Sequence, residues 1–363
     1  DVSTAKNQPS TKELQDTLLF NMKPLAEQFG KEEDETTPGK LLTGMIRRAY
    51  ETTGKQVAVI IDEYDAPLLE VLHEEEALPE YRRVMQELYT PLKASEPMIR
   101  FCFITGITKF SQLSIFSTIN NLKNVTMLPQ FSAICGITEQ ELVTDMAEDI
   151  RRMAEEEECT PEEMHAKLKQ QYDGYRFSKK EEEIYNPFSL MNAFGDKMLN
   201  SYWFASGTPT FLIRQMQHFR TDITTMEHIE AVASAFDRPT EAMESALPLL
   251  YQSGYLTIKD YDRETDSYIL AIPNKEVRVG FIEGLMPTYI GLDGSSVQVG
   301  FAMKFWRALK RNNLDLAMQE MKAFLAGIPY VEGFQKKLEA AKNYEGFYEY
   351  TFRLIFNMLN VYA

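Results

Sequence analysis

Two adjacent acids, Asp62 and Glu63, directly follow the apolar run VAVII at residues 57–61. A short run rich in β-branched residues predicts a buried strand, and ligands of α/β proteins bind at the carboxyl ends of such strands. There the first carboxylate can hold Mg²⁺, which prefers hard oxygen ligands, and the second can accept a proton from an attacking water. The alternative is structural: the acids form a turn, and Asp65 caps the helix that follows.

Polar residues also follow a second apolar run, at residues 99–105. In P-loop ATPases the strand beside the acid-bearing strand ends in a polar sensor of the γ-phosphate or the attacking water. We expect Thr105 to be that residue and take Thr108 as the second choice, as a contact to the cofactor. Lys109 could contact a phosphate, although a lysine after a strand is more often solvated. Together these features predict Walker B and sensor 1 elements.

Composition sets the broad class of the chain. Its 363 residues favour two or three domains, and a hydrophobic fraction of 44% is typical of a globular protein. The formal charge of −16 argues against non-specific binding of nucleic acid by the whole surface. The three cysteines are widely spaced, which predicts reduced thiols in a cytoplasmic protein rather than a disulfide frame or zinc site. No apolar run approaches the length of a membrane span.

Strands that alternate with helices predict a parallel α/β sheet, as in a partial P-loop ATPase core over residues 1–140. We expect a helix to begin at Thr37 and end at Gly54, and a third strand at 124–131. A helical lid over 141–224 follows. Two alternating runs around a turn near 262–266 predict a hairpin, and with the helices before it a winged-helix-like module at 225–290. Residues 291–363 are expected to be helical.

Several motifs, in this order, resemble those of the bacterial AAA-ATPase-like family: VIIDEYDAPLL, FCFITGITKFSQLSIFSTINNL, YDGYRFS, YNPFSLMNAF and IPNKEVRVGF. In that family a P-loop ATPase is joined to a C-terminal PD-(D/E)xK nuclease-like domain. The resemblance implies ATP and Mg²⁺ as cofactors of the complete protein. It also implies that Arg176, in the lid motif YDGYRFS, contacts a nucleotide phosphate; the alternative is a turn residue that packs on Tyr172 and Phe177.

The chain also departs from that family. It has no Walker A loop, GxxxxGK[ST], because its GK pairs at 39–40 and 54–55 are followed by Leu and Gln and lack the upstream glycine. The nuclease-like catalytic residues would lie beyond Ala363. We therefore expect this chain to be a portion of a longer protein, inactive alone and without a tight site for ATP.

Two classes of function stay open. In the first, the complete protein is an ATP-binding and ATP-hydrolysing switch that gates the nuclease-like domain. In the second, the ATPase fold is degenerate and acts as an interaction scaffold or regulatory module. Nucleotide is the expected partner, and nucleic acid, through the winged helix or the nuclease-like domain, is a further candidate. The acidic balance weakens that candidate, although KFWRALKRNN at 304–313 is locally basic. No membrane partner is expected.

Overall fold

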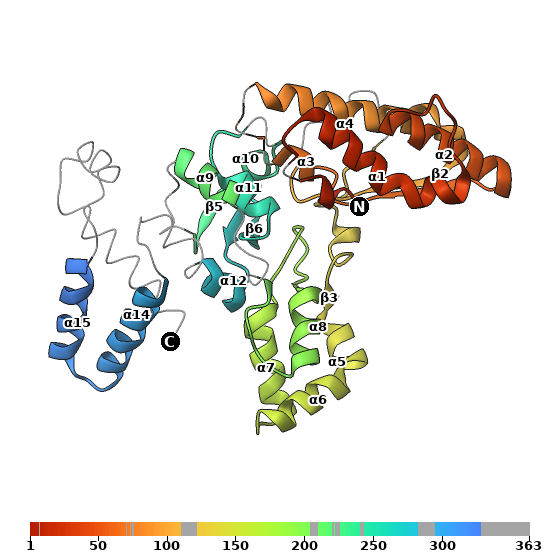
Figure 1. Ribbon diagram of the computed structural model, residues 1–363. Helices are drawn as coiled ribbons and strands as arrows, with labels where there is room; N and C mark the ends of the chain where they lie inside the picture. Colours follow the sequence, from red (N-terminus) through yellow and green to blue (C-terminus); the bar gives the residue numbers. More distant parts are fainter. Residues whose placement is uncertain are drawn as a thin grey trace. The chain divides into compact units, whose positions relative to one another are not determined.

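The computed structural model describes residues 1–6, 8–69, 71–72, 74, 76–109, 122–203, 210–219, 221, 226–239, 243–281 and 295–327 (Figure 1). The chain is mixed α/β and forms two compact units. Unit 1 consists of Asp1–Asn124 and Ser234–Ser253, and unit 2 of Val125–Ala233 and Gly254–Ala363. The second segment of unit 1 is thus embedded in the sequence of unit 2.

Three long helices pack together in unit 1, and each boundary follows from a local signal. The Ser10 side chain accepts a hydrogen bond from the Glu13 amide at the start of the first helix. As predicted, the second begins after Thr37, whose side chain caps it, and ends at Gly54 in the left-handed conformation. The long helices are α1 (Thr11–Phe29), α2 (Pro38–Thr53) and α4 (Ala77–Ala94). Short helical elements are η1 (Ser3–Ala5), α3 (Ala66–Leu69) and η2 (Glu96–Met98).

The sheet of unit 1 pairs β1 (Val57–Ile61) with β2 (Ile99–Ile104) in parallel, which confirms the predicted arrangement. Because side chains alternate along a strand, the sheet has two faces. Val59 is buried on one face, whereas Ile60 and Phe101, on the other, are 68% and 55% exposed. Parallel sheets are normally covered on both faces. In the described part of unit 1, only the face that carries Val59 is covered.

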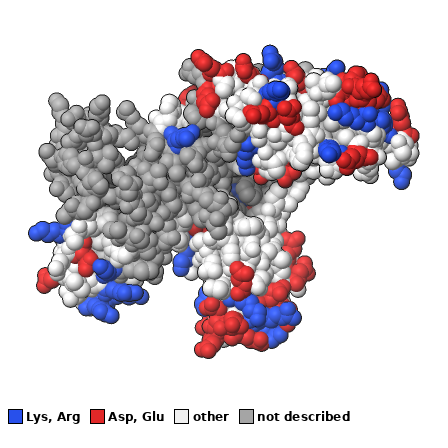
Figure 2. Space-filling view, in the orientation of Figure 1, with Lys and Arg blue, Asp and Glu red and all other residues white. Residues whose placement is uncertain are grey.

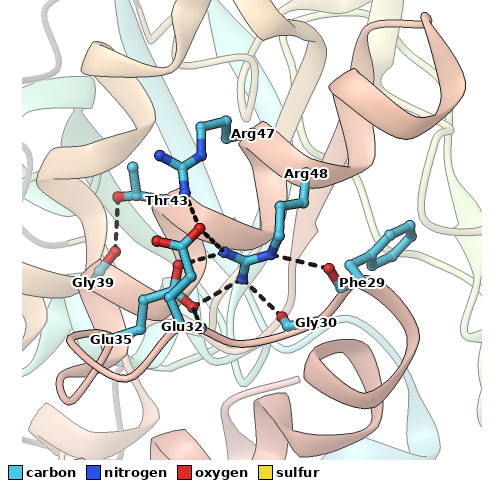
Figure 3. A network of polar contacts seen from close by, with 8 residues as sticks. All are labelled: Phe29, Gly30, Glu32, Glu35, Gly39, Thr43, Arg47 and Arg48. Carbon is cyan, nitrogen blue, oxygen red and sulfur yellow. Dashed lines mark hydrogen bonds and ion pairs between the residues drawn. The ribbon is translucent and has the colours of Figure 1, made fainter.

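A network of polar contacts ties the loop before α2 to that helix (Figure 3). The Arg48 guanidinium donates to both carboxylate oxygens of Glu35, at 2.6 and 2.8 Å, and to the carbonyls of Phe29 and Gly30. Glu35 is only 4% exposed, and these hydrogen bonds from Arg48 lower the pKa of its carboxyl. The Glu35 carboxylate lies so close to the α2 backbone that position 44 requires a glycine, since an added Cβ there would lie 1.5 Å from a Glu35 carboxylate oxygen.

Unit 2 begins with a helical subdomain. The side chains of Thr138 and Thr160 each form a capping box with the glutamate three residues later, which fixes the start of two helices. β3 (Ile137–Thr138) pairs with β4 (Ile184–Tyr185) in antiparallel fashion. The helices are α5 (Glu139–Asp145), α6 (Ala147–Glu156), α7 (Pro161–Tyr172) and α8 (Pro187–Asp196). Their apolar faces form one core that includes Leu142, Met153, Met164, Leu168, Tyr172, Tyr185 and Leu190.

A three-stranded antiparallel sheet follows, in the order β5 (Ile229–Val232), β7 (Ser267–Ala271), β6 (Thr257–Asp262). The predicted hairpin is confirmed, and Asp266 adopts a positive φ of 50° in its turn. The strand expected at 124–131 is wrong: Pro129 opens a short 3₁₀ turn, η3 (Pro129–Phe131), instead. The helices in this part of the sequence are α9 (Thr210–His218), α10 (Ala233–Phe236), α11 (Leu247–Gln252) and α12 (Lys275–Gly280). Of these, α11 and all of α10 after its first residue belong to unit 1.

The last described segment is a helical hairpin of α14 (Ser295–Lys310) and α15 (Leu314–Gly327). Its two helices pack through Phe301, Phe305, Ala308, Ala317 and Met321. No helix in the described parts of the chain has both the length and the apolar character that a membrane crossing requires.

The buried ion pair of Arg48 predicts a large loss of stability on substitution. We expect Arg48→Met to lower the free energy of unfolding by about 3 kcal/mol, because Glu35 is left buried without its partner. Arg47→Met, which loses an ion pair to the half-exposed Glu32, is the control and should cost about 1 kcal/mol or less. Urea unfolding at neutral pH measures both losses. Equal losses would contradict a special contribution of the buried pair between Arg48 and Glu35.

The pKa of Glu35 gives this pair a pH dependence. Its folded-state pKa lies below the unfolded value of 4.5, so its stabilising contribution is complete above that value. The contribution is lost as the pH falls through the lowered pKa. The difference in unfolding free energy between wild type and Arg48→Met should therefore shrink in acid. A difference that stays constant to pH values well below 4.5 would show that Glu35 is not its source.

Candidate functional site

The residues that follow β1 and β2 meet at one edge of the sheet. The Thr105 amide donates to the Ile61 carbonyl at 2.9 Å, which continues the pairing of the strands by one residue. The Thr105 hydroxyl then donates to Oδ1 of Asp62. The predicted placement of Asp62 and Thr105 at the same edge is confirmed. With Glu63, Asp65 and Thr108 these residues form what we call the strand-end cluster.

Asp62 has one open carboxylate oxygen, which a hydrated Mg²⁺ could use. Its side chain is exposed, and the contacts to its carboxylate, from the Thr105 hydroxyl and the Glu63 amide, fall on Oδ1. Mg²⁺ usually keeps several waters and binds through one or two carboxylates, so a single open carboxylate oxygen beside a hydroxyl fits such an ion. The described residues contain no group of three or more His, Cys, Asp or Glu side chains that could enclose a metal by themselves.

Glu63 is held differently from its neighbour. Its backbone is in the left-handed region, with φ of 53°, which costs an ordinary residue about 1–2 kcal/mol. Its carboxylate forms an ion pair of 2.9 Å with the ammonium group of Lys6, and both side chains are about one-third exposed. The N-terminal segment is fixed nearby, because the Val2 amide donates to the Asp62 carbonyl at 3.0 Å. Lys6 therefore occupies one oxygen of the acid that we expected to accept a proton.

Asp65 is a member of the cluster whose part the sequence did not reveal. It is fully buried, and its carboxylate accepts hydrogen bonds from the amide of Ile107 (3.2 Å) and from the amide and hydroxyl of Thr108 (2.6 Å each). Burial raises the pKa of Asp65, and the hydrogen bonds from Thr108 oppose that rise. The expected helix cap is made by its backbone carbonyl, to which the amides of Leu68 and Leu69 donate. The side chain instead holds the loop after β2.

That loop fits closely against the segment after β1. The Tyr64 amide donates to the Thr105 carbonyl at 3.0 Å, and the Tyr64 hydroxyl donates to the Thr108 carbonyl at 2.9 Å. A Cβ added at Gly106 would lie 2.4 Å from Oδ1 of Asp65, so this position requires glycine. An acid placed inside the buried run YDAPLL was the available sequence signal for a long-range contact of this kind.

Thr108 and Lys109 bind the loop after β2 to other parts of unit 1: Thr108 contacts Asp65, and Lys109 contacts the segment Ser234–Ser253. Thr108 is buried, and its hydroxyl is bonded to Asp65 rather than facing solvent. The Lys109 ammonium group contacts Asp237 twice, at the carboxylate (2.9 Å) and the carbonyl (3.1 Å). The Lys109 amide donates to the Gln252 side chain at 2.7 Å, and that side chain donates to the Arg238 carbonyl at 2.9 Å. The loop after β2 is thereby fastened to α10 and α11.

Arg176 belongs to unit 2 and is 5% exposed. Its guanidinium donates to three backbone carbonyls, those of Ser178 (3.0 Å), Lys259 (3.1 Å) and Lys179 (2.9 Å). Its own amide donates to the Thr257 hydroxyl at 2.8 Å. These contacts secure the turn after α7 to strand β6. These contacts agree with the structural alternative for Arg176, a residue that stabilises a turn.

Comparisons with known proteins give a family match for the first part of the chain and one relative for most of it. Residues 1–116 match the model of a family described as predicted AAA-ATPase. The chain is also similar to a protein of Azotobacter chroococcum mcd 1, "Uncharacterized protein in vnfD 5'region", with 32% identity over 314 residues. That alignment covers 85% of the chain and 57% of the relative, so the chain spans little more than half of the relative's length. No solved structure matches the chain. The segment that carries the whole strand-end cluster is therefore similar to the predicted AAA-ATPase family.

Proposed function

We propose that this chain supplies the metal-binding and water-activating acids of an ATP-binding and ATP-hydrolysing switch. The contact between the Thr105 hydroxyl and Asp62, at the ends of two parallel strands, is the observation that carries the proposal. In P-loop ATPases a Walker B acid and a polar sensor occupy this edge of the sheet. The family match over residues 1–116 supports the same assignment.

Three residues of the cluster have distinct parts in this proposal. Asp62 would hold the Mg²⁺ of an Mg²⁺–ATP complex, and Glu63 would orient the attacking water and accept its proton. Thr105 keeps Asp62 in place and senses the γ-phosphate. Bound Mg²⁺ would supply positive charge to the phosphate oxygens. Lys6 occupies one carboxylate oxygen of Glu63, so the other oxygen, or either one once the ion pair opens, would accept the proton.

The remainder of the nucleotide site would come from a longer protein. No GxxxxGK[ST] loop occurs in the sequence, so nothing in it matches the phosphate-binding nest and lysine of that motif. The exposed sheet face that includes Ile60 and Phe101 supports the same view, because apolar residues of a parallel sheet are normally covered. ATP hydrolysis and the nuclease-like domain implied by the family resemblance are thus proposals for that longer protein.

We further propose that the output of the switch passes through a winged-helix-like module. Along the chain α9, β5, α10, α11, β6 and β7 follow one another, and the sheet order is β5-β7-β6. That order is the one a winged helix would have. The clamp of Lys109 on Asp237 and Gln252 attaches α10 and α11 to the loop after Thr105. A displacement of Thr105 on nucleotide binding would therefore pull on the helices that connect β5 with β6.

A degenerate ATPase fold that acts as a scaffold is the second candidate. The ion pair between Lys6 and Glu63 favours it, because the ammonium group stabilises the charged carboxylate and makes it a weaker proton acceptor. The three carbonyl contacts of Arg176 point the same way, since a guanidinium used inside a turn is not available to a phosphate. The experiments below separate the two candidates.

The chain itself should bind ATP weakly and hydrolyse it negligibly. Backbone amides of a Walker A loop and its lysine make most phosphate contacts in such sites, and this chain lacks them. Isothermal titration with ATP and Mg²⁺ is expected to show no tight site. A dissociation constant of about 1 µM or lower would contradict the need for that loop.

In a longer protein that carries a Walker A loop, Glu63→Gln should block hydrolysis and retain ATP binding. Glutamine keeps the shape and the hydrogen-bonding oxygen but cannot accept the proton, so the loss falls on kcat. Asp62→Asn should instead weaken Mg²⁺-dependent binding, because it removes charge beside the metal. If wild type and Glu63→Gln turn over ATP equally at saturation, Glu63 is not the base and the scaffold is the better reading.

The burial of Asp65 predicts that its removal disturbs the loop after β2. Asp65→Ala leaves two amides and a hydroxyl without their acceptor, and we expect a loss of about 3 kcal/mol or more in the free energy of unfolding. Hydrogen exchange at 106–109 should rise, whereas the amides of α7 in unit 2 should not change. Asp34→Ala, an exposed acid in the loop before α2, is the control and should stay within about 0.5 kcal/mol. Unchanged exchange at 106–109 would contradict the clamp.

A further inference from the structure

Helix α14 and the residue after it carry four cations within eight residues, 304–311, and no acid lies among them. Between Ser295 and Leu314 there are four basic residues and no Asp or Glu, in a chain whose formal charge is −16. All four side chains are exposed, and within the described residues none forms an ion pair. They are Lys304, Arg307, Lys310 and Arg311. Positive charge of this density, without neutralising partners, attracts polyanions.

The four cations share one side of the helix. At 100° per residue they fall within an arc of about 120°, and about 10 Å separates the first from the last along the axis. The opposite side packs on α15 through Phe301, Phe305 and Ala308. Figure 2 shows blue groups gathered at the end of the hairpin where α14 meets α15. We call these four side chains the α14 basic face.

The hairpin holds this face in a fixed orientation. Asn312 takes a positive φ of 51° in the turn, and the Asn313 side chain caps α15 by accepting from the Leu316 amide at 3.0 Å. The Phe301 and Phe324 rings stack with centroids 4.2 Å apart across the two helices. The Lys310 ammonium group lies 5.3 Å from the centre of the Trp306 ring. An indole beside a cation is a surface on which an unpaired base can also stack.

We propose that the α14 basic face binds the phosphate backbone of nucleic acid. Phosphates are the repeating anions whose neutralisation by Lys and Arg drives binding independently of sequence. The apolar side of α14 is already used against α15, so the helix cannot insert into a bilayer or dock by that side on a partner helix. The proposal does not depend on the nucleotide site.

The hairpin of the winged-helix-like module is a poorer candidate for this contact. Its strands and turn, Thr257–Ala271, carry two basic residues and four acids, a net charge of −2. One of the two cations, Lys259, is already used: its ammonium group donates to the carbonyls of Gly174 and Pro273 at 2.9 Å each and pairs with Glu183. Charge on this chain therefore directs nucleic acid to α14 rather than to the hairpin.

The test is binding of the full 363-residue chain to a fluorescent DNA duplex of mixed sequence, about 20 base pairs long, between about 50 and 200 mM salt. The logarithm of the binding constant should fall with the logarithm of salt with a slope of up to about −3.6, if four phosphates are neutralised. A variant with Lys304→Gln, Arg307→Gln, Lys310→Gln and Arg311→Gln should lose binding at least tenfold and flatten the slope. Arg307→Gln alone should reduce the slope by about 1.

The control carries the same change of charge elsewhere: Lys12→Gln, Lys55→Gln, Arg83→Gln and Arg100→Gln, all exposed positions in unit 1. It should bind DNA within twofold of the wild type. Circular dichroism checks that both quadruple variants fold. If the quadruple variant at 304–311 does not fold, the change in salt slope caused by Arg307→Gln alone tests the proposal. Absence of binding at about 50 mM salt, equal losses in both quadruple variants, or stronger binding to polyglutamate or to anionic vesicles than to DNA would overturn the proposal.

Discussion

The buried carboxylate of Asp65 is the contact on which the strand-end geometry depends. Pairing of β1 with β2 brings Asp62 and Thr105 to one edge, but the chain beyond each strand needs a separate restraint. Asp65 supplies it by accepting three hydrogen bonds from residues 107–108 at a site closed to solvent. Low local polarity strengthens each hydrogen bond and makes its loss costly, so the clamp holds the segments after the two strands together.

This restraint divides the cluster into a fixed side and an adjustable side. Asp62 and Thr105 are bracketed by the strands before them and by the buried clamp behind them. Within the described residues, the Glu63 side chain is held by an ion pair between partly exposed groups, which is worth about 1 kcal/mol or less. Its left-handed backbone costs about 1–2 kcal/mol, so the ion pair does not offset the strain of this residue. Glu63, the proposed proton acceptor, is therefore held less strongly than Asp62, and opening its ion pair with Lys6 costs about 1 kcal/mol or less.

Much of the fold followed from local sequence signals. Helix boundaries came from Thr37 and Gly54, and the parallel strands and the late hairpin came from apolar patterning, because each is decided within a few residues. The strand expected at 124–131 failed where Pro129 outweighed the apolar pattern. The meeting of Asp62 with Thr105 was predictable from sheet topology. The part of Asp65 was not, since its partners lie 42 and 43 residues away and a local cap explained it equally well.

The same limit explains Arg176. Resemblance between families carries a residue's type and order but not the hydrogen bonds that it makes, and three carbonyls of its own unit take up this guanidinium. A phosphate contact would have to replace those bonds in a position that is almost closed to solvent, and it would leave buried carbonyls without donors. Cations that serve a ligand are better sought where burial has not already assigned them. In this structure the buried Arg176 is bound by its own fold, whereas the four cations at 304–311 are exposed and close together, which is the arrangement that the proposed contact to phosphates needs.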